Sequence, residues 1–218
     1  MITAICPIDG RYASKVVELT ECFSEYALVR NRVRVEVFWL EALCAEPGIP
    51  ECRALSADER ALLAGIVDDF TPQEAEKVKE IERTTNHDVK AVEYYLKQKI
   101  VGSSLEELSE FLHFACTSED INNLSHALML KEGLAALLPH QQEIVDQLKA
   151  FAQKWKAVPM LARTHGQTAS PTTIGKELAV FADRLAFQMQ KEKAVEILGK
   201  LNGAVGNFNA HLSAYPDV

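Results

Sequence analysis

The sequence predicts an all-α protein in which a small N-terminal helical domain precedes the first part of a long-helix bundle. Apolar residues recur at helical spacing through most of the 218 residues, whereas the alternating apolar and polar runs typical of strands are scarce. The apolar stretches also become longer toward the C-terminal end. These observations predict a helical domain over residues 1–105 and a truncated bundle domain over residues 106–218.

The first domain is expected to begin with an extended arm over residues 1–20, which contain a proline, a glycine and several polar residues. A helix is predicted over 24–46, because apolar residues follow helical spacing there and Pro47-Gly48 ends the pattern. Two capping motifs, Ser56-Ala57-Asp58-Glu59 and Thr71-Pro72-Gln73-Glu74, each predict the start of a further helix.

The remaining pattern predicts two short helices and two long helical segments. The short helices are expected from His87 to Lys99 and from Ser104 to His113. A long segment runs over 118–155, where Pro139 would kink the helix, divide it or begin a second one. The segment over 171–198 carries an apolar stripe at Ile174, Leu178, Phe181, Leu185 and Met189. Two long segments do not complete a bundle, so partner helices are expected from elsewhere.

Composition limits the classes of function. The net charge of −8 argues against nucleic-acid binding and against an anionic membrane surface as a partner. No apolar run reaches the length of about 18 residues needed for a membrane span, and the N-terminus does not resemble a signal peptide. Five cysteines without a Cys-x-x-Cys pair indicate free thiols in a reducing, cytoplasmic setting rather than disulfides or zinc.

Three polar clusters interrupt the helical pattern, and each combines a histidine with hydroxyl or amide groups. They are Arg83-Thr84-Thr85-Asn86-His87-Asp88, His113-Phe114-Ala115-Cys116-Thr117-Ser118-Glu119-Asp120, and Arg163-Thr164-His165-Gly166-Gln167. Helix N-termini present unpaired N–H groups that suit carboxylates or phosphates. The first two clusters are also explained as simple helix caps, and His165 as an ordinary turn residue. Three such clusters in one chain favour a binding site.

Other kinds of site are poorly supported by the sequence. Glu110 and His113 have the spacing used in di-iron bundles, but a second copy of this pair is missing, so no metal is expected. The sequence also lacks the nucleophile turn of a hydrolase, a P-loop and a dinucleotide-binding glycine motif. No cofactor is therefore expected.

At the polar clusters the sequence resembles the adenylosuccinate lyase family of the fumarase/aspartase superfamily. The resemblance extends along essentially the whole chain. It is carried by Pro7-Ile8-Asp9-Gly10-Arg11-Tyr12, Glu82-Arg83-Thr84-Thr85-Asn86-His87-Asp88-Val89-Lys90-Ala91-Val92-Glu93-Tyr94, His113-Phe114-Ala115-Cys116-Thr117-Ser118-Glu119-Asp120-Ile121-Asn122-Asn123, Arg163-Thr164-His165-Gly166-Gln167 and Asn202-Gly203-Ala204-Val205-Gly206-Asn207. The sequence departs from the bacterial branch at Thr168, where a proline is expected.

The resemblance implies a β-elimination in purine biosynthesis. Members of the family release fumarate from adenylosuccinate, which gives AMP, and from the succinylated aminoimidazole carboxamide ribotide. By resemblance, His165 is the general acid that protonates the departing nitrogen, and His87 lies near the reacting atoms. Histidine suits such a role because it titrates near neutral pH.

The resemblance also implies a set of substrate-binding residues. Arg11 and Tyr12 match residues that hold the nucleotide phosphate, and Asn86, His87 and Asp88 match a nucleotide-contacting run. Thr117 and Ser118 match hydroxyls that bind the succinyl or fumarate carboxylates, as Thr164 is also expected to do. Gln167 belongs to the same predicted site, and His113 lies in its neighbourhood without a defined role.

One part of the family's site is not found in these residues. The family's base is a serine in a loop of the pattern Ser-Ser-x-Met-Pro-x-Lys-x-Asn-Pro, and the 218 residues contain no such segment. The resemblance therefore implies an N-terminal fragment that is inactive alone. It also implies a homotetramer, because the family's active sites draw residues from three subunits.

Two other hypotheses remain open from the sequence. One is a different lyase of the superfamily, such as argininosuccinate lyase or fumarase, although the Arg11-Tyr12 arm and the Asn86-His87-Asp88 run resemble the nucleotide-specific branch. The other is a non-enzymatic helical oligomerisation module whose polar clusters are caps. Binding of AMP that is weakened by Arg11→Ala or His87→Ala would distinguish the first hypothesis from both.

Overall fold

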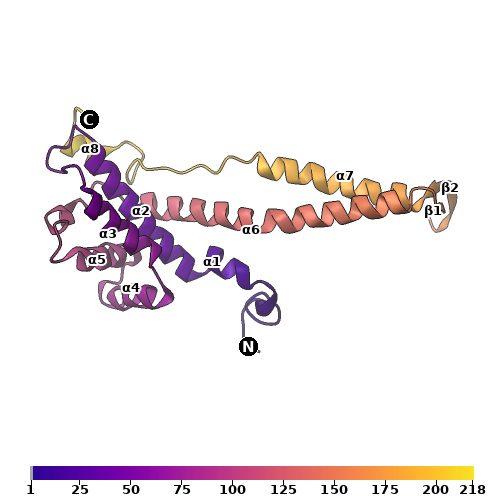
Figure 1. The fold of residues 1–218 in the computed structure, drawn as a ribbon, viewed down its shortest axis with the longest axis horizontal. Helices are drawn as coiled ribbons and strands as arrows, with labels where there is room; N and C mark the ends of the chain where they lie inside the picture. Colours follow the sequence, from indigo (N-terminus) through magenta and orange to yellow (C-terminus); the bar gives the residue numbers. More distant parts are fainter. Residues whose placement is uncertain (1) are drawn as a thin grey trace. The chain divides into compact units, whose positions relative to one another are not determined.

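The computed structural model describes residues 2–218, and helices dominate it (Figure 1), as the sequence predicted. The chain forms two compact units. The first unit comprises the chain up to Glu132 together with Leu198–Val218, and the second unit comprises Gly133–Ile197. The domain boundary predicted near residue 105 does not coincide with these units and stays a prediction.

The first unit is organised around one central helix, α2 (Glu25–Ala45). Three further helices pack against it, namely α3 (Ala57–Asp68), α4 (Pro72–Thr85) and α5 (Asp88–Ile100). One face of α2 supplies the core residues Val29, Val33, Val37 and Leu40, each at most 2% exposed. Their spacing of three or four residues keeps them on one side of the helix, so burying this stripe holds the unit together.

Side-chain caps fix three predicted helix starts, two of them at the capping motifs seen in the sequence. Ser24 accepts a hydrogen bond from the N–H of Ala27 at 3.1 Å and begins α2. Ser56 and Glu59 form both bonds of a capping box. Thr71 accepts from the N–H of Glu74 at 3.4 Å, with a proline in the first turn of α4. The three predicted starts are therefore confirmed.

Two local predictions were wrong. The chain at the N-terminus is turned rather than extended, because Asp9 and Gly10 both donate backbone hydrogen bonds to the carbonyl of Cys6. Short helices follow there, namely η1 (Ala13–Lys15), η2 (Val17–Leu19) and α1 (Thr20–Phe23). The helix expected up to His113 is only a 3-10 helix, η3 (Glu106–Phe111). It ends early because His113 takes a left-handed conformation and gives its N–H to the carboxylate of Glu36.

The second unit contains a hairpin that the sequence did not predict. Strand β1 (Pro159–Thr164) pairs antiparallel with β2 (Gln167–Thr173), and the register is irregular between Leu161 and Arg163. Most residues of both strands are exposed. A hairpin that covers no core has no buried face, so it lacks the alternating apolar pattern by which strands are recognised.

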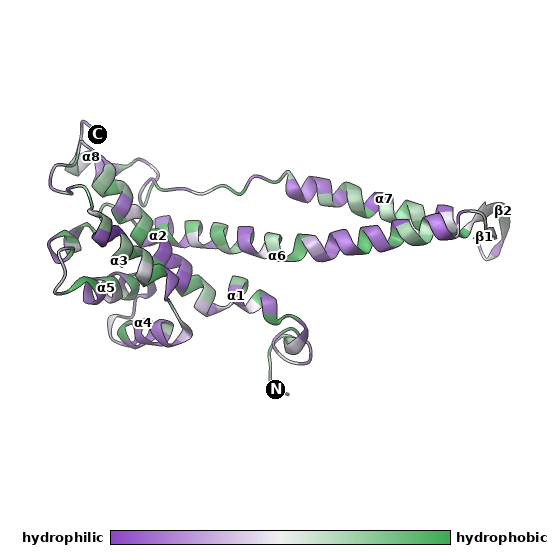
Figure 2. Ribbon diagram, viewed as in Figure 1, coloured by the Kyte–Doolittle hydropathy of each residue, from purple (hydrophilic) through white to green (hydrophobic). Residues whose placement is uncertain are grey.

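The helices of the second unit follow the predicted long segments. Helix α6 (Ser118–Lys154) begins in the first unit and continues into the second, and Pro139 lies inside it without dividing it. Helix α7 (Ile174–Lys193) starts at a Thr173 cap, later than predicted. Apolar and polar residues alternate along it (Figure 2). Within its predicted stripe, Met189 is 3% exposed but Phe181 is 59% exposed, so the stripe is only partly covered.

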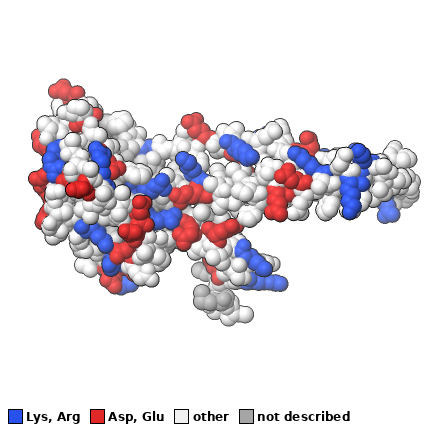
Figure 3. Space-filling view, viewed as in Figure 1, with Lys and Arg blue, Asp and Glu red and all other residues white. Residues whose placement is uncertain are grey.

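The surface of the first unit carries both signs of charge. On the face drawn in Figure 3, acidic and basic side chains lie beside one another over this unit.

The last helix of the chain is the short α8 (Asn209–Ala214) near the C-terminal end. None of the helices described between residues 2 and 218 has both the length and the apolar character needed to cross a membrane.

Candidate active site

His87 lies at the junction of α4 and α5, where its conformation is set by the backbone. Asn86 ends α4 in the left-handed conformation, with φ of 50°. His87 then becomes the N-cap of α5, and its Nδ1 accepts a hydrogen bond from the N–H of Lys90 at 3.1 Å. This bond fixes the ring and leaves Nε2 for other contacts. The side chain is half exposed, so a ligand can reach it.

The Nε2 atom of His87 meets Ser118, the first residue of α6, with 3.3 Å between it and the serine Oγ. The first and second polar clusters of the sequence are therefore brought together. Each contributes the N-terminus of a helix, where unpaired N–H groups and the helix dipole favour an anion. This junction of α5 and α6 has the chemistry to bind a carboxylate or a phosphate.

Asp88, the first residue of α5, is partly exposed and pairs with a residue of the central helix. Its carboxylate lies 2.5 Å from the guanidinium of Arg32 on α2, and the Nε of Arg32 donates to Asn122 on α6 at 2.8 Å. Burial acts to raise the pKa of Asp88, but the charge of Arg32 and backbone hydrogen bonds hold it below its usual value. Asp88 therefore contacts protein groups that tie three helices together.

Asp120 anchors the start of α6 to the returning chain at residues 200–203. It is fully buried, and its Oδ1 accepts from the Lys200 ammonium at 2.8 Å and from the N–H of Asn202 at 3.1 Å. Its Oδ2 accepts from the N–H groups of Thr117 at 2.9 Å and Gly203 at 3.2 Å. Although burial opposes it, these donors hold the pKa of Asp120 below its usual value. The carboxylate therefore fixes the backbone next to Ser118.

His113 belongs to a buried pair rather than to the exposed junction. Its Nδ1 lies 2.6 Å from a carboxylate oxygen of Glu36, whose side chain is fully buried, and its backbone N–H donates to the other oxygen at 3.1 Å. Burial lowers the pKa of His113, but the hydrogen bond and charge of Glu36 outweigh it, so the net shift is upward. His113 therefore supports the loop before α6 from inside. The nearby Glu110, which lies on η3, pairs with Lys97 instead, at 2.9 Å.

Arg11 and Tyr12 lie in the turned N-terminal segment and are both exposed. The guanidinium carbon of Arg11 lies 5.5 Å from the centre of the Tyr12 ring. Among residues 2–218, neither side chain forms a hydrogen bond with the other predicted site residues. The structure thus leaves both side chains open to solvent and does not bring them to the His87 junction.

The third cluster forms the tip of the hairpin in the second unit. Thr164 pairs with Gln167, so His165 and Gly166 are the two loop residues, with φ of 50° and 73°. Two positive φ values in a two-residue loop are what a type I′ turn requires. Thr164, His165 and Gln167 are all exposed, and the described part of the chain offers the His165 ring no hydrogen bond or ion pair. His165 is therefore a turn residue that is presented to solvent.

Sequence reasoning missed the residues that position these groups. Arg32, Glu36 and Lys200 were not singled out at all, and Asn122 and Asp120 were noted only as members of the second cluster and its continuation, without a role. A signal existed for Arg32 and Glu36, because helical spacing places both on the same face of the central helix as the apolar residues Val29, Val33 and Val37. A charge in such a place is buried and needs a partner. Lys200 had no comparable signal, since its partner lies 80 residues earlier in the chain.

Comparison with known proteins identifies relatives along the whole chain. Residues 10–217 match the family model described as Lyase. The chain is 53% identical over 219 residues to adenylosuccinate lyase from Escherichia coli strain K12, 50% to that from Legionella pneumophila strain Corby, and 46% over 223 residues to that from Dictyostelium discoideum. Each alignment covers 100% of this chain and 48% of the relative. The chain thus spans about half the length of the curated relatives it matches, and the predicted resemblance is confirmed.

Solved structures with lower identity show the same fold. The fumarate lyase from Mesorhizobium sp. BNC1 superposes with a TM-score of 0.70 at 23% identity, covering 92% of this chain and 45% of that one. The 3-carboxy-cis,cis-muconate lactonizing enzyme from Pseudomonas putida gives 0.72 at 20% identity, again covering 92% and 45%. These likenesses show the fold alone.

Proposed function

Because this chain belongs to the lyase family, we propose that it carries the substrate-binding and general-acid residues of an adenylosuccinate lyase. Such an enzyme would release fumarate by β-elimination from adenylosuccinate and from the succinylated aminoimidazole carboxamide ribotide, in purine biosynthesis. The observation that carries the proposal is the contact between His87 and Ser118, which joins two helix N-termini at a half-exposed position. The identity of 53% along the whole chain supports it.

The junction of α5 and α6 would bind a carboxylate of the succinyl group. Ser118 offers a hydroxyl there, and Thr117 offers another next to it in the chain. The Nδ1 of His87 is occupied by the helix cap, so its Nε2 is the atom that can approach the substrate. Hydrogen bonds to an ionised carboxylate are stronger than neutral ones, and pre-positioned donors pay little entropy to form them.

The nucleotide would be held by residues that present polar groups to solvent. Arg11 and Tyr12 are proposed to bind its phosphate, because a guanidinium and a phenol both donate to phosphate oxygens. Asn86, exposed at the end of α4, is proposed to contact the same nucleotide. Asp88 and His113 are proposed to act indirectly, since both are engaged with protein partners.

His165 is proposed as the general acid that protonates the departing nitrogen, with Thr164 and Gln167 beside it. Its exposed place at the tip of a two-residue turn supports this role, because a general acid needs access to the leaving group. The base that removes the opposing proton is not assigned among these residues. We propose that the 218-residue chain does not complete the elimination alone.

We also propose that the chain assembles into a homotetramer. Four large apolar side chains of the second unit are between 44% and 59% exposed, namely Ile144, Phe151, Phe181 and Phe187. They lie on α6 and α7, the two long helices of this unit. Apolar groups of this size on long helices are usually covered by neighbouring helices, which other subunits would supply.

The proposal is tested by titrating the chain with AMP and, separately, with fumarate in a calorimeter. We expect both to bind. Ser118→Ala should weaken fumarate binding about tenfold, since one charge-assisted hydrogen bond is lost. Arg11→Ala should weaken AMP binding by a similar factor and leave fumarate binding unchanged.

A matched pair of variants separates binding from helix capping at His87. Asparagine caps helices well, so His87→Asn keeps an acceptor for the Lys90 N–H, whereas His87→Ala removes both the cap and the Nε2 group. Both variants should weaken binding equally if Nε2 contacts the ligand. If the chain binds fumarate but not AMP, a different lyase is indicated. If it binds neither ligand, or if all four variants bind both ligands as tightly as the wild type, the proposal is refuted.

A further inference from the structure

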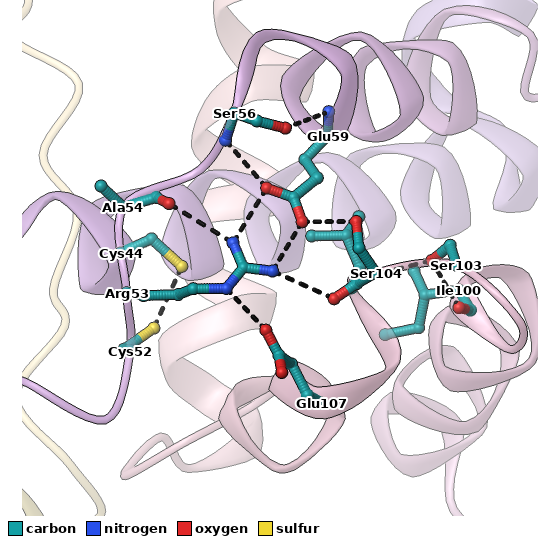
Figure 4. A network of polar contacts seen from close by, with 11 residues as sticks. Cys44, Cys52, Arg53, Ala54, Ser56, Glu59, Ile100, Ser103, Ser104 and Glu107 are labelled. Carbon is teal, nitrogen blue, oxygen red and sulfur yellow. Dashed lines mark hydrogen bonds and ion pairs between the residues drawn. The ribbon is translucent and has the colours of Figure 1, made fainter.

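Two buried cysteines lie in contact in the first unit, outside the proposed active site. Cys44 lies in the last turn of α2, and Cys52 follows in the connection to α3. Their sulfur atoms are 3.0 Å apart, and the residues are 4% and 2% exposed. Figure 4 shows the two side chains pointing toward each other beside the Arg53 network.

The backbone between the cysteines explains why the sulfurs meet. Three successive turn hydrogen bonds wind the connection, from the N–H of Glu46 to the carbonyl of Leu43, from Ile49 to Glu46, and from Cys52 to Ile49. The chain therefore folds back upon the end of α2 within a few residues. This local turn structure brings the two thiols into contact, and both are buried in the core of the first unit.

We propose that Cys44 and Cys52 form an oxidation site, which closes into an intramolecular disulfide when the protein meets a hydroperoxide. A disulfide needs sulfurs at about 2.05 Å, so the two atoms have to approach by about 1 Å. The other cysteines are placed differently. Within the described residues Cys6, Cys22 and Cys116 have no thiol partner.

The chemistry balances with hydrogen peroxide as the oxidant. One cysteine, as the thiolate, attacks a peroxide oxygen and breaks the O–O bond, which gives a sulfenic acid and one water once the protons are redistributed. The second sulfur then attacks the sulfenic sulfur, breaks its S–O bond and releases a second water. The two sulfurs together lose two electrons, and the peroxide gains them. A thiol reductant reverses the step by exchange.

The surroundings of the two cysteines make their oxidation by peroxide slow. Burial raises the pKa of the Cys44 thiol and raises that of Cys52 to about 12. The adjacent guanidinium of Arg53 does not offset this, because it is held by the carboxylates of Glu59 at 2.7 Å and Glu107 at 2.5 Å (Figure 4). The thiolate is therefore scarce near neutral pH. As long as the pH stays below the pKa, each increase of one pH unit should raise the oxidation rate about tenfold.

Closure would fix the connection between α2 and α3. That connection contains Glu51, whose carboxylate accepts a hydrogen bond from Tyr215 near the C-terminal end at 2.9 Å. It also contains Gly48, whose backbone closely approaches the side chain of Val218. The bridge would thus restrain the surface on which the chain from Tyr215 onward rests.

The test is peptide mapping of the chain after treatment with hydrogen peroxide. The reduced protein is incubated with peroxide at two pH values one unit apart, denatured, alkylated and digested. We expect two fewer alkylated cysteines, a linked pair of peptides that contains Cys44 and Cys52, and a rate about tenfold greater at the higher pH. Restoration by dithiothreitol should return both alkylation sites.

Matched variants show whether proximity decides the outcome. Cys44→Ala and Cys52→Ala should each abolish the linked peptides, whereas the triple variant Cys6→Ser, Cys22→Ser, Cys116→Ser should keep them. The wild-type map alone decides the question if a variant fails to fold. The proposal is overturned if both cysteines stay alkylated, if they are oxidised singly to sulfinic or sulfonic acid, or if either is linked to another cysteine.

Discussion

The two units of the molecule hold their polar clusters in opposite ways. In the first unit, Asp120 accepts four hydrogen bonds and His113 is paired with a buried carboxylate. In the second unit, His165 projects from a hairpin turn and has no hydrogen-bond partner among residues 2–218. The polar groups of the first unit are thus held in place by the protein, whereas the His165 side chain of the second unit is presented to solvent.

The comparison also explains why these polar residues have different consequences for stability. A buried charge whose partners are removed costs free energy, because it loses both water and protein contacts. An exposed side chain without partners costs almost nothing to replace. Removing the buried carboxylate of Asp120 should therefore destabilise the first unit, whereas removing the exposed ring of His165 should leave the stability of the second unit almost unchanged. The two tryptophans can report on the units separately, since Trp39 lies in the first and Trp155 in the second.

The largest effect is expected for Asp120→Ala. This change leaves the Lys200 ammonium and three backbone N–H groups without their acceptor, so the free energy of unfolding of the first unit should fall by about 3–5 kcal/mol. Urea unfolding followed by Trp39 fluorescence in a Trp155→Phe background measures it. The control Asp183→Ala, at an exposed position of α7, should change stability by less than about 0.5 kcal/mol. Equal effects of the two changes would contradict the structural role of Asp120.

An intermediate effect is expected from the buried pair of Glu36 and His113, and it depends on pH. Burial lowers the pKa of His113 but Glu36 raises it more, so the net value lies above the ordinary 6.5, and burial also raises the pKa of Glu36. The folded state thus holds a proton that the unfolded chain releases. Its contribution to stability is fully present below pH 6.5 and is lost as pH rises through the folded pKa, at up to about 1.4 kcal/mol per pH unit.

The measurement for this pair is an NMR titration of the histidine rings together with unfolding at several pH values. The His113 midpoint should lie above 6.5 in the wild type and should fall in Glu36→Gln, where the charge is removed but the shape is kept. The decline of stability with rising pH should flatten in the same variant. A His113 midpoint that does not respond to Glu36→Gln would show that the pair does not share the proton.

Particular residues show how far the sequence predicts this molecule. Ser56 and Thr71 gave correct helix starts, because capping is local and depends on residues within one turn. The sequence indicated two separate clusters but not the contact between His87 and Ser118. Local patterns do not show that two positions 31 residues apart meet. The hairpin around Thr164–Gln167 was missed because none of its strand residues is fully buried. Long-range partners and unburied strands leave no periodic signal.

The smallest effect on stability, and the sharpest contrast with the first unit, is expected for His165→Ala. The ring has no hydrogen-bond or ion-pair partner among residues 2–218, so its removal should change the unfolding free energy of the second unit by less than about 0.5 kcal/mol. Trp155 fluorescence in a Trp39→Phe background follows this unfolding. Gly166→Val is the matched control in the same turn. At φ of 73° a β-branched residue is strained, so stability should fall by about 1–3 kcal/mol.

For catalysis, His165→Ala should have a large effect although its effect on stability is small. In a full-length lyase that contains these residues, loss of a general acid lowers turnover of adenylosuccinate by about 10²–10⁴-fold. His165→Ala should therefore remove activity without unfolding the protein, whereas Asp120→Ala should remove both together. A His165→Ala enzyme that keeps its turnover, or that loses it only because the second unit unfolds, would show that the hairpin tip does not supply the acid.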